Sequence, residues 1–312
     1  MKPALAFVQK RFSLVLVITL FLIFALAYPE RFLSGPNISA MLRQFLRLSL
    51  FAIGPTIVVV VGSIDLSFVG LWMLGGVLVW YAAPLFGPAA IVVYPLLGVL
   101  LGFLVGFLQV KARIPSFILT LSTTIVCWGL TAWLSGGYPR RVRGLEFITT
   151  SVIPYVPAAV FLAVPVIFGA VYIMHWTRVG TYFYAIGSNE EGATLSGINT
   201  ERYRVLAFVL SGLFTGLSLI ILFPLLGGAA PVELKLGNLV EPLVAIVLGG
   251  TPLIGGSGGP ERTLLGALIF SIIQRGLSLT FWQPELIQLI LGVVMLGAIF
   301  VGTRRLRGVV IT

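Results

Sequence analysis

The chain has 312 residues, of which 58% are hydrophobic and only 10% are charged, and its mean hydropathy is +1.09. Soluble domains carry roughly 25% charged residues, so this composition excludes a soluble protein and predicts an integral membrane protein. The formal net charge of +10 does not gather in a basic cluster on a soluble module. This distribution argues against a nucleic-acid partner and favours cationic loops and chain ends in the cytoplasm.

A helix needs about 20 mostly apolar residues to cross a bilayer. The first such run ends in Ala-Leu-Ala and imitates a secretory signal, but we interpret it as a retained span because further apolar runs follow it. We therefore predict an all-α membrane fold that occupies residues 1–312 as one domain. Its ten expected spans lie at roughly 12–28, 41–61, 66–83, 89–109, 115–135, 155–175, 205–224, 239–250, 263–281 and 286–302.

Asp65, the only aspartate in the chain, lies at a glycine-containing break between the second and third apolar runs. A carboxylate inside a membrane is by default a functional hypothesis. Asp65 also directly precedes the third run at Leu66, where its side chain can cap the helix. We favour the cap and keep a solute or ion contact as the alternative.

Three glycines of the fourth run and two of the seventh repeat at four-residue spacing. This small-xxx-small pattern lets membrane helices approach closely, so we expect helix packing at Gly98, Gly102, Gly106, Gly212 and Gly216. The single cysteine, Cys127, excludes an internal disulfide. His175, the single histidine, lies at a membrane edge without the partners that a metal site needs.

The longest polar interruption, residues 177–204, contains the signals of a short helix. Ser188 followed by Glu191 has the spacing of a capping box, and Glu190 and Glu191 lie in the first turn, where the helix dipole favours negative charge. Gly197 supplies the left-handed position that ends a helix. A short capped helix between two spans is not a packing element of the bilayer, so we expect another protein to bind it.

The eighth apolar run is short and ends in LGGTPLIGGSGGPE, so we expect it to break or re-enter. This region resembles the earlier break: Pro55 aligns with Pro242, Gly62 with Gly249 and Leu66 with Leu253. Duplicated glycine-broken helices point to the pathway of a transporter.

The other polar groups in or near spans make up the remaining pathway candidates. Arg275 can equally snorkel to the interface or line a polar cavity. Together with the aspartate described above, the candidate pathway or substrate residues are Asp65, Glu241, Gln274 and Arg275.

Ten spans place both termini on one side, and the positive-inside rule makes that side cytoplasmic. The 177–204 loop falls on the same side. The cluster Arg140, Arg141 and Arg143 is an exception, explained by pairing with Glu146, by an outside partner or by a miscounted span. The basic residues that support the orientation are Lys2, Lys10, Arg11, Lys111, Arg113, Arg178, Arg202, Arg204, Arg262, Arg304, Arg305 and Arg307.

The chain has no G-x-x-x-x-G-K-[ST] phosphate loop, so it does not hydrolyse ATP itself. It also has no chain of intramembrane Asp, Glu and His to relay protons. We therefore do not expect this chain to be an enzyme.

Four segments in order, GSIDLSFVGLWMLGG, PSFILTLSTTIVCWGLTAWLSGG, AIGSNEEGATLSGIN and AIVLGGTPLIGGSGGPERTLLGALI, resemble the membrane permease subunits of bacterial ABC importers. The likeness runs from about residue 45 to 302. More specifically, the chain resembles the branch that serves ribose and other monosaccharides, alongside the branched-chain amino acid permeases. The first segment reads GSIDLSFVG where the sugar branch often reads GGIDLSVG. This departure weakens any inference about the solute.

The resemblance implies a multi-pass permease of the bacterial inner membrane, paired with an identical or homologous second permease subunit. It implies two cytoplasmic ATPase subunits that hold ATP and Mg, and an extracytoplasmic binding protein that delivers a small polar solute. A sugar is our first choice, with a nucleoside or other polar solute, or a stand-alone secondary transporter, as alternatives. The ATPase-coupling segment would comprise Gly187, Ser188, Asn189, Glu190, Glu191, Gly192, Ala193, Thr194, Leu195, Ser196, Gly197, Ile198 and Asn199.

Overall fold

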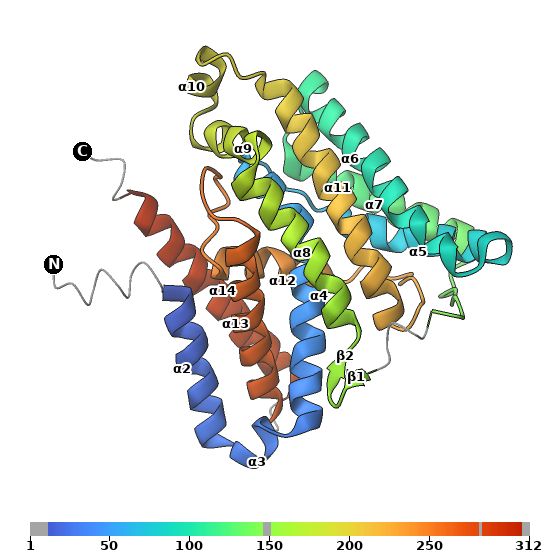
Figure 1. Ribbon diagram of the computed structural model, residues 1–312, viewed down its shortest axis with the longest axis vertical. Helices are drawn as coiled ribbons and strands as arrows, with labels where there is room; N and C mark the ends of the chain where they lie inside the picture. Colours follow the sequence, from blue (N-terminus) through green and yellow to red (C-terminus); the bar gives the residue numbers. More distant parts are fainter. Residues whose placement is uncertain (1–11, 146–150, 281–282, 308–312) are drawn as a thin grey trace.

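The computed structural model describes residues 12–145, 151–280 and 283–307, and a helix occupies each of the ten apolar runs (Figure 1). Lys2, Lys10 and Arg11 lie outside the described residues. The long helices are α2 (Phe12–Ala27), α4 (Gly35–Val60), α5 (Ser67–Phe86), α6 (Val93–Ala112), α7 (Ser116–Ser135), α8 (Ala159–Trp176), α11 (Thr200–Leu225), α12 (Leu236–Leu248), α13 (Pro260–Ser278) and α14 (Pro284–Arg307).

Short elements connect these helices. A one-turn helix, α3 (Pro29–Phe32), follows α2, and a 3-10 helix, η1 (Gly87–Val92), separates α5 from α6. Strands β1 (Ser151–Ile153) and β2 (Val156–Pro157) form an antiparallel hairpin before α8, with Ser151 opposite Pro157. The polar loop folds into two helices rather than one, α9 (Arg178–Ser188) and α10 (Glu190–Leu195). Helices α10 and α3 lie at opposite ends of the structure (Figure 1), which we call the α10 end and the α3 end.

Within the described ranges, five helical stretches are long and apolar enough to cross a membrane by length and composition: Gly35–Val60, Ser67–Ala112, Ser116–Ser135, Ala159–Trp176 and Thr200–Leu225. The second of these contains α5, η1 and α6. Shorter apolar helices lie at Ser13–Ala27, Leu236–Leu248 and Glu285–Val294. The expected all-α membrane fold is confirmed.

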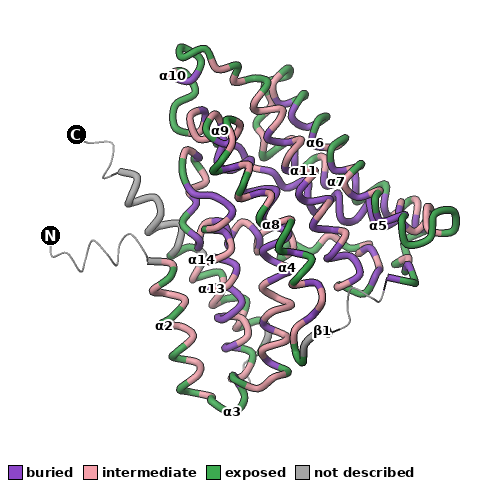
Figure 2. The backbone as a smooth tube through the Cα atoms, viewed as in Figure 1, coloured by how far each residue is buried: buried purple, intermediate pink, exposed green. Residues whose placement is uncertain are grey.

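Helix α4 lies at the centre of the fold. Its second half, residues 48–60, is buried throughout, and it packs against α11, α12 and α13. Helices α6 and α7 instead carry many exposed residues along their length (Figure 2). Large apolar side chains such as Phe103, Phe107, Ile125 and Trp133 lie on these exposed faces. In a membrane protein, such surfaces suit contact with lipid.

The repeated glycines lie where α6 packs directly against α11, so the close helix packing predicted at these glycines is confirmed. A Cβ on Gly98 would lie 2.1 Å from the carbonyl oxygen of Gly212, and a Cβ on Gly212 would lie 1.9 Å from that of Gly98. Neither distance is compatible with a side chain, so the two backbones touch because both residues are glycine.

The two glycine breaks form matching units of helix, turn and helix. Helix α4 ends with the left-handed Gly62 (φ +82°), whose N–H bonds Val59 while that of Ser63 bonds Val58. Helix α12 ends in the same way with the left-handed Gly250 (φ +94°). In this motif the left-handed residue follows the cap, so the structural counterpart of Gly62 is Gly250, one residue beyond the Gly249 of the sequence alignment.

The eighth apolar run is broken, as predicted. Helix α12 has 13 residues, and at 1.5 Å per residue it is about 20 Å long, shorter than the roughly 30 Å hydrocarbon core. The chain continues through a loop at residues 249–259, which we call the glycine loop, and then enters α13.

Arg140, the first residue of the arginine cluster after α7, has side-chain partners within the fold. Arg140 donates from Nε to the carbonyl oxygen of Ser135 at the end of α7 (2.9 Å), and its guanidinium lies 4.9 Å from the ring centre of Trp80. The neighbouring Val142 donates from its backbone to Gly228 beyond α11 (2.8 Å). Glu146, the partner considered from the sequence, lies outside the described residues.

Candidate functional site

Helix α10 begins at Glu190, and its cap is Asn189. The Asn189 Oδ1 accepts a hydrogen bond from the backbone N–H of Gly192 (2.9 Å). The predicted capping box of Ser188 and Glu191 is therefore wrong. Ser188 is the last residue of α9, and its hydroxyl donates to the Gly256 carbonyl (3.2 Å). Because Asn189 is both the C-cap of α9 and the N-cap of α10, only one residue joins the two helices.

The other end of α10 follows the prediction. Gly197 is left-handed (φ +83°), its N–H bonds the carbonyl of Thr194 (2.9 Å), and the N–H of Ile198 bonds that of Ala193 (3.1 Å). Asn199 then caps α11 through a bond from the Arg202 N–H (3.0 Å). The coupling candidates Gly187–Asn199 therefore form a segment whose backbone ends are hydrogen-bonded on both sides.

The side chains of α10 divide into an inner and an outer set. Ala193 is buried, and Glu190 forms an ion pair with Arg204 of α11. The Leu195 side chain points outward and is 84% exposed. An exposed leucine on a short capped helix is suited to burial against another protein, since removing apolar area from water is favourable.

The end of α9 lies against both glycine breaks. A Cβ on Gly187 would lie 1.9 Å from the carbonyl oxygen of Val60 and 2.5 Å from the backbone nitrogen of Gly256. The Gly256 N–H donates to the same Val60 carbonyl (2.9 Å). Three segments singled out separately from the sequence therefore meet at one place: the polar loop, the end of α4 and the glycine loop.

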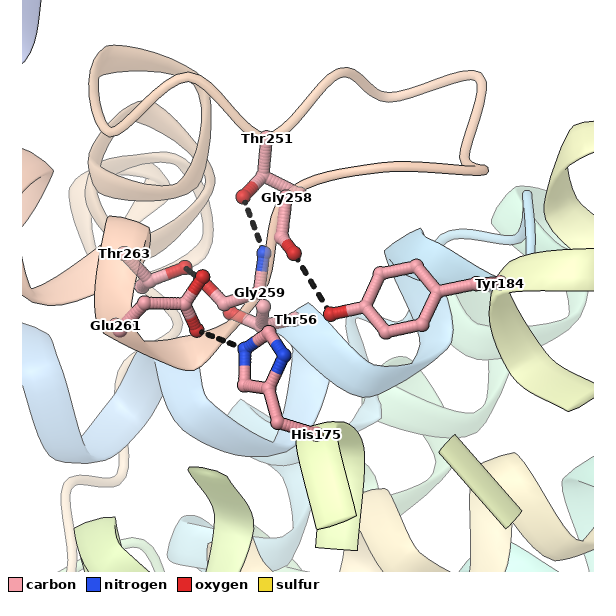
Figure 3. Close-up of polar contacts among 8 residues, drawn as sticks. All are labelled: Thr56, His175, Tyr184, Thr251, Gly258, Gly259, Glu261 and Thr263. Atoms are coloured by element: carbon pink, nitrogen blue, oxygen red, sulfur yellow. Dashed lines mark hydrogen bonds and ion pairs between the residues drawn. The ribbon is translucent and has the colours of Figure 1, made fainter. Parts of the chain in front are cut away.

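Tyr184 of α9 provides a second attachment to the glycine loop (Figure 3). Its hydroxyl donates to the carbonyl oxygen of Gly258 (2.7 Å). Burial, together with the nearby Glu261 carboxylate, raises the pKa of the Tyr184 hydroxyl to about 12. The hydroxyl therefore remains a hydrogen-bond donor throughout the neutral range. The sequence reading did not single out Tyr184, because a tyrosine within the first half of the 177–204 segment carries no local signal of its own.

His175 connects the end of α8 to the start of α13. Its Nε2 lies 2.9 Å from Oε2 of Glu261, and both side chains are partly exposed (38% and 41%) (Figure 3). Among the described residues, no group of three or more His, Cys, Asp or Glu side chains is arranged to hold a metal ion. The role that geometry supports for His175 is therefore to link two helices at the α10 end.

The glycine loop is also closed on itself. Thr251 Oγ1 accepts from the N–H of Gly259 (3.1 Å), and the Thr263 hydroxyl donates to the Gly259 carbonyl (3.3 Å). The hydroxyls of Thr263 and Thr56 lie 2.8 Å apart, which joins α13 to α4 (Figure 3). These bonds hold the loop in one shape against both helices.

Both carboxylate oxygens of Asp65 accept hydrogen bonds from serine residues of the protein. The helix after the first break begins at Ser67 with Leu66 at the N-cap position, so Asp65 is not the cap residue that the sequence suggested. Its Oδ1 nonetheless accepts from the backbone N–H and the hydroxyl of Ser67 (2.8 and 2.6 Å). Its Oδ2 accepts from the hydroxyl of Ser211 on α11 (2.7 Å), and the residue is buried.

Two of the remaining pathway candidates come together. Glu241 of α12 forms an ion pair with Arg47 of α4, Arg47 donates from Nε to Oε1 of Gln44 (3.2 Å), and the Gln44 amide donates to Gln274 of α13. Arg275 points elsewhere, to Oδ1 of Asn37 at the start of α4 (2.9 Å). The sequence reading missed Gln44 and Arg47, although a cation inside the second apolar run was a visible signal.

The arrangement can transmit movement from α10 to the turns that end α4 and α12, because α9, which is joined directly to α10, touches both turns. Comparison with known proteins agrees with a transport role. A family model described as the branched-chain amino acid transport system / permease component matches residues 37–299.

The relatives include sugar permeases. The ribose import permease protein RbsC of Haemophilus influenzae is 31% identical over 96% of this chain and 96% of the relative. The xylose transport system permease protein XylH of Escherichia coli is 30% identical over 86% of each. The RbsC protein of Bacillus subtilis is 32% identical over 88% of this chain and 87% of the relative.

Proposed function

The chain belongs to the branched-chain amino acid transport system / permease component family, and from this membership we propose that it is the permease subunit of an ATP-driven importer for a small polar solute, most simply a sugar. The family consists of transport permease subunits, which are not enzymes. The names of the ribose and xylose permeases at about 30% identity support the sugar as the solute.

ATP hydrolysis then takes place in separate partner subunits. We place two ATPase subunits at the α10 end, a second permease subunit, identical or homologous, beside this one, and a binding protein at the α3 end. The α10 end faces the cytoplasm in this proposal, with both termini on the same side of a bacterial inner membrane. Basic residues such as Lys111, Arg178 and Arg204 support this orientation.

The observation that carries the proposal is the contact of α9 with the Val60 carbonyl and with Gly256. An ATPase that binds α10 moves a six-residue helix joined to α9 through Asn189 alone. Because α9 touches both turns, its displacement moves the end of α4 and the glycine loop together. Both turns flank central helices, so this displacement provides a route to alternating access.

Leu195 offers a direct test of the docking surface. We expect Leu195→Asp to reduce copurification of the ATPase subunits strongly, because an exposed apolar contact is replaced by a charge. Leu195→Met, which keeps the apolar volume, serves as the matched control. Equally strong copurification of the ATPase subunits with both variants would show that α10 is not part of the interface.

Function itself is tested in proteoliposomes that contain the permease, the ATPase and the binding protein. We expect labelled ribose to be taken up only when ATP is present on the side of the membrane that α10 faces. Depending on how the permease inserts, that side is the inside or the outside of the vesicle. Uptake by the purified permease alone, driven by a proton or sodium gradient, would instead establish a secondary transporter and overturn the proposal.

A further inference from the structure

We propose that Gln44, Arg47, Glu241 and Gln274 line the solute pathway and contact a neutral, polyhydroxylated solute as it passes. We call these four residues the polar cluster. They come from α4, α12 and α13 and are linked by the Arg47–Glu241 ion pair, the Arg47–Gln44 bond and the Gln44–Gln274 bond. The inference rests on the proposed function and adds the residues and the chemistry of the pathway.

The polar cluster lies deep in the membrane. Arg47 lies halfway along the 26-residue helix α4, so it falls near the middle of the bilayer. Charged residues at this depth are costly and almost always face a water-filled cavity or another polar group. The ion pair covers them only partly, since the side chains of Arg47 and Glu241 stay 17% and 24% exposed. Lipid cannot satisfy this remaining surface, and a hydrated pathway can.

Open space lies beside the polar cluster. A groove of about 290 Å³ lies between α12, α13 and α14 and is lined by Val240, Glu241, Val244, Phe270, Gln288 and Leu291. Glu241 therefore belongs to the polar cluster and also lines the groove. A solute in the groove would meet apolar walls on one side and the cluster at its edge, as is usual for small-molecule sites.

The chemical groups of the polar cluster suit a neutral solute. Arg47 and Glu241 neutralise each other, and each glutamine amide offers both a donor and an acceptor. A sugar hydroxyl also donates and accepts, so it can replace the Gln44–Gln274 bond by two similar bonds. Such exchange lets a solute enter and leave, which conduction requires. A free amino acid carries two charges that would compete with the ion pair, so the cluster suits a neutral solute.

The neighbouring polar residues have other partners. Arg275 is bound to Asn37 (2.9 Å), and the Asn37 amide donates to the Phe32 carbonyl (2.8 Å), which fastens α13 to the start of α4. Asp65 is held by Ser67 and Ser211. We therefore exclude Arg275 and Asp65 from the pathway and assign both a structural role in holding helices together.

The test uses the assembled importer in proteoliposomes with labelled ribose as the probe. For Gln44→Leu and Gln274→Leu we expect ribose uptake to fall about tenfold, the loss that follows when a hydrogen bond to the passing solute disappears. ATP hydrolysis by the complex should continue, so more ATP is consumed per ribose. A residue that only supported the fold would lower assembly and both activities together.

Ser271→Ala is the matched control. Ser271 lies on the same helix as Gln274, but its hydroxyl donates to Ala267 within the helix (2.7 Å), so uptake should not change. Should a leucine variant fail to assemble, Gln274→Asn takes its place, because it retains an amide on a side chain that is one methylene shorter. The ATP consumed per ribose is then measured on this variant.

The outcomes separate the two proposals. Unchanged uptake and an unchanged ratio in the glutamine variants would overturn the pathway assignment while the importer stands. Absence of ATP-dependent uptake by the wild-type complex would overturn the importer itself. Uptake of labelled leucine in place of ribose would contradict the neutral solute, because leucine carries both charges.

Discussion

Gly187 of α9 lies so close to Val60 at the end of α4 that a Cβ on the glycine would stand 1.9 Å from the Val60 carbonyl oxygen. The same oxygen accepts the backbone N–H of Gly256 in the glycine loop (2.9 Å). One carbonyl therefore joins the end of a central helix, the second glycine break and the helix that leads to α10. Movement of α9 cannot leave both turns in place.

Gly187→Ala tests this contact. The added methyl group must push α9 away from Val60, and overpacking of this kind typically costs about 1–3 kcal/mol. We expect the melting temperature of the purified permease to fall and ribose uptake by the importer to drop more than ATP hydrolysis. Gly129→Ala is the control, because no atom lies within 4 Å of its Cβ position. Equal uptake in the two variants would contradict the coupling role of the contact.

The cap of α10 is tested by a pair of neighbouring alanine substitutions. Asn189→Ala removes the side chain that accepts from the Gly192 N–H, and loss of such a cap costs about 1 kcal/mol. Ser188→Ala removes only the bond to the Gly256 carbonyl. We expect faster backbone hydrogen exchange in α10 for Asn189→Ala alone. The reverse order would restore Ser188 as the cap.

Gly197 and Glu190 hold the two ends of α10 and should matter for coupling more than for folding. Gly197 is left-handed with no atom within 4 Å of its Cβ position, so Gly197→Ala adds backbone strain of about 1–2 kcal/mol without a clash. Glu190→Gln weakens the ion pair with Arg204. In both variants we expect the importer to hydrolyse ATP with reduced ribose uptake. Unchanged uptake and unchanged ATPase binding in both would contradict this role.

Tyr184 predicts a dependence of stability on alkaline pH. Its pKa is raised to about 12 in the folded protein, against roughly 10 in an unfolded chain. The contribution of this hydroxyl is therefore complete below pH 10 and is lost as the pH rises toward 12, because the unfolded state releases its proton first. We expect Tyr184→Phe to lower the melting temperature at neutral pH.

The same variant supplies its own comparison across pH. The difference in melting temperature between wild type and Tyr184→Phe should shrink between pH 10 and pH 12 as the wild-type contribution disappears. A difference that stays constant over this interval would contradict the raised pKa of Tyr184, and no difference at neutral pH would show that the Gly258 hydrogen bond contributes nothing to stability.

Much of the fold could be predicted from local patterns. A spanning helix must be apolar along its whole length, so hydropathy located the ten long helices of the described residues. The small-residue spacing likewise predicted close helix packing at Gly98 and Gly212, although only the structure identified α6 and α11 as the two partners. The left-handed Gly197 was also correct, because the end of a helix depends on its own backbone.

The candidate site was only partly predictable. The spacing of Ser188 and Glu191 fitted a capping box, yet α9 continues through Ser188 and leaves Asn189 as the cap. Packing of α9 against Val60 and Gly256 decided this register, and no local pattern records that packing.

The sequence by itself determined that the protein is a membrane-embedded bundle of helices with two glycine breaks and a polar capped segment, because hydropathy, capping and backbone handedness act over a few neighbouring residues. Only the tertiary structure decided that Gly187 meets Val60 and that Arg47 pairs with Glu241. These partners lie far apart along the chain. Their meeting depends on how whole helices pack and on which polar groups remain to be satisfied in the interior, and that balance exists only once the chain has folded.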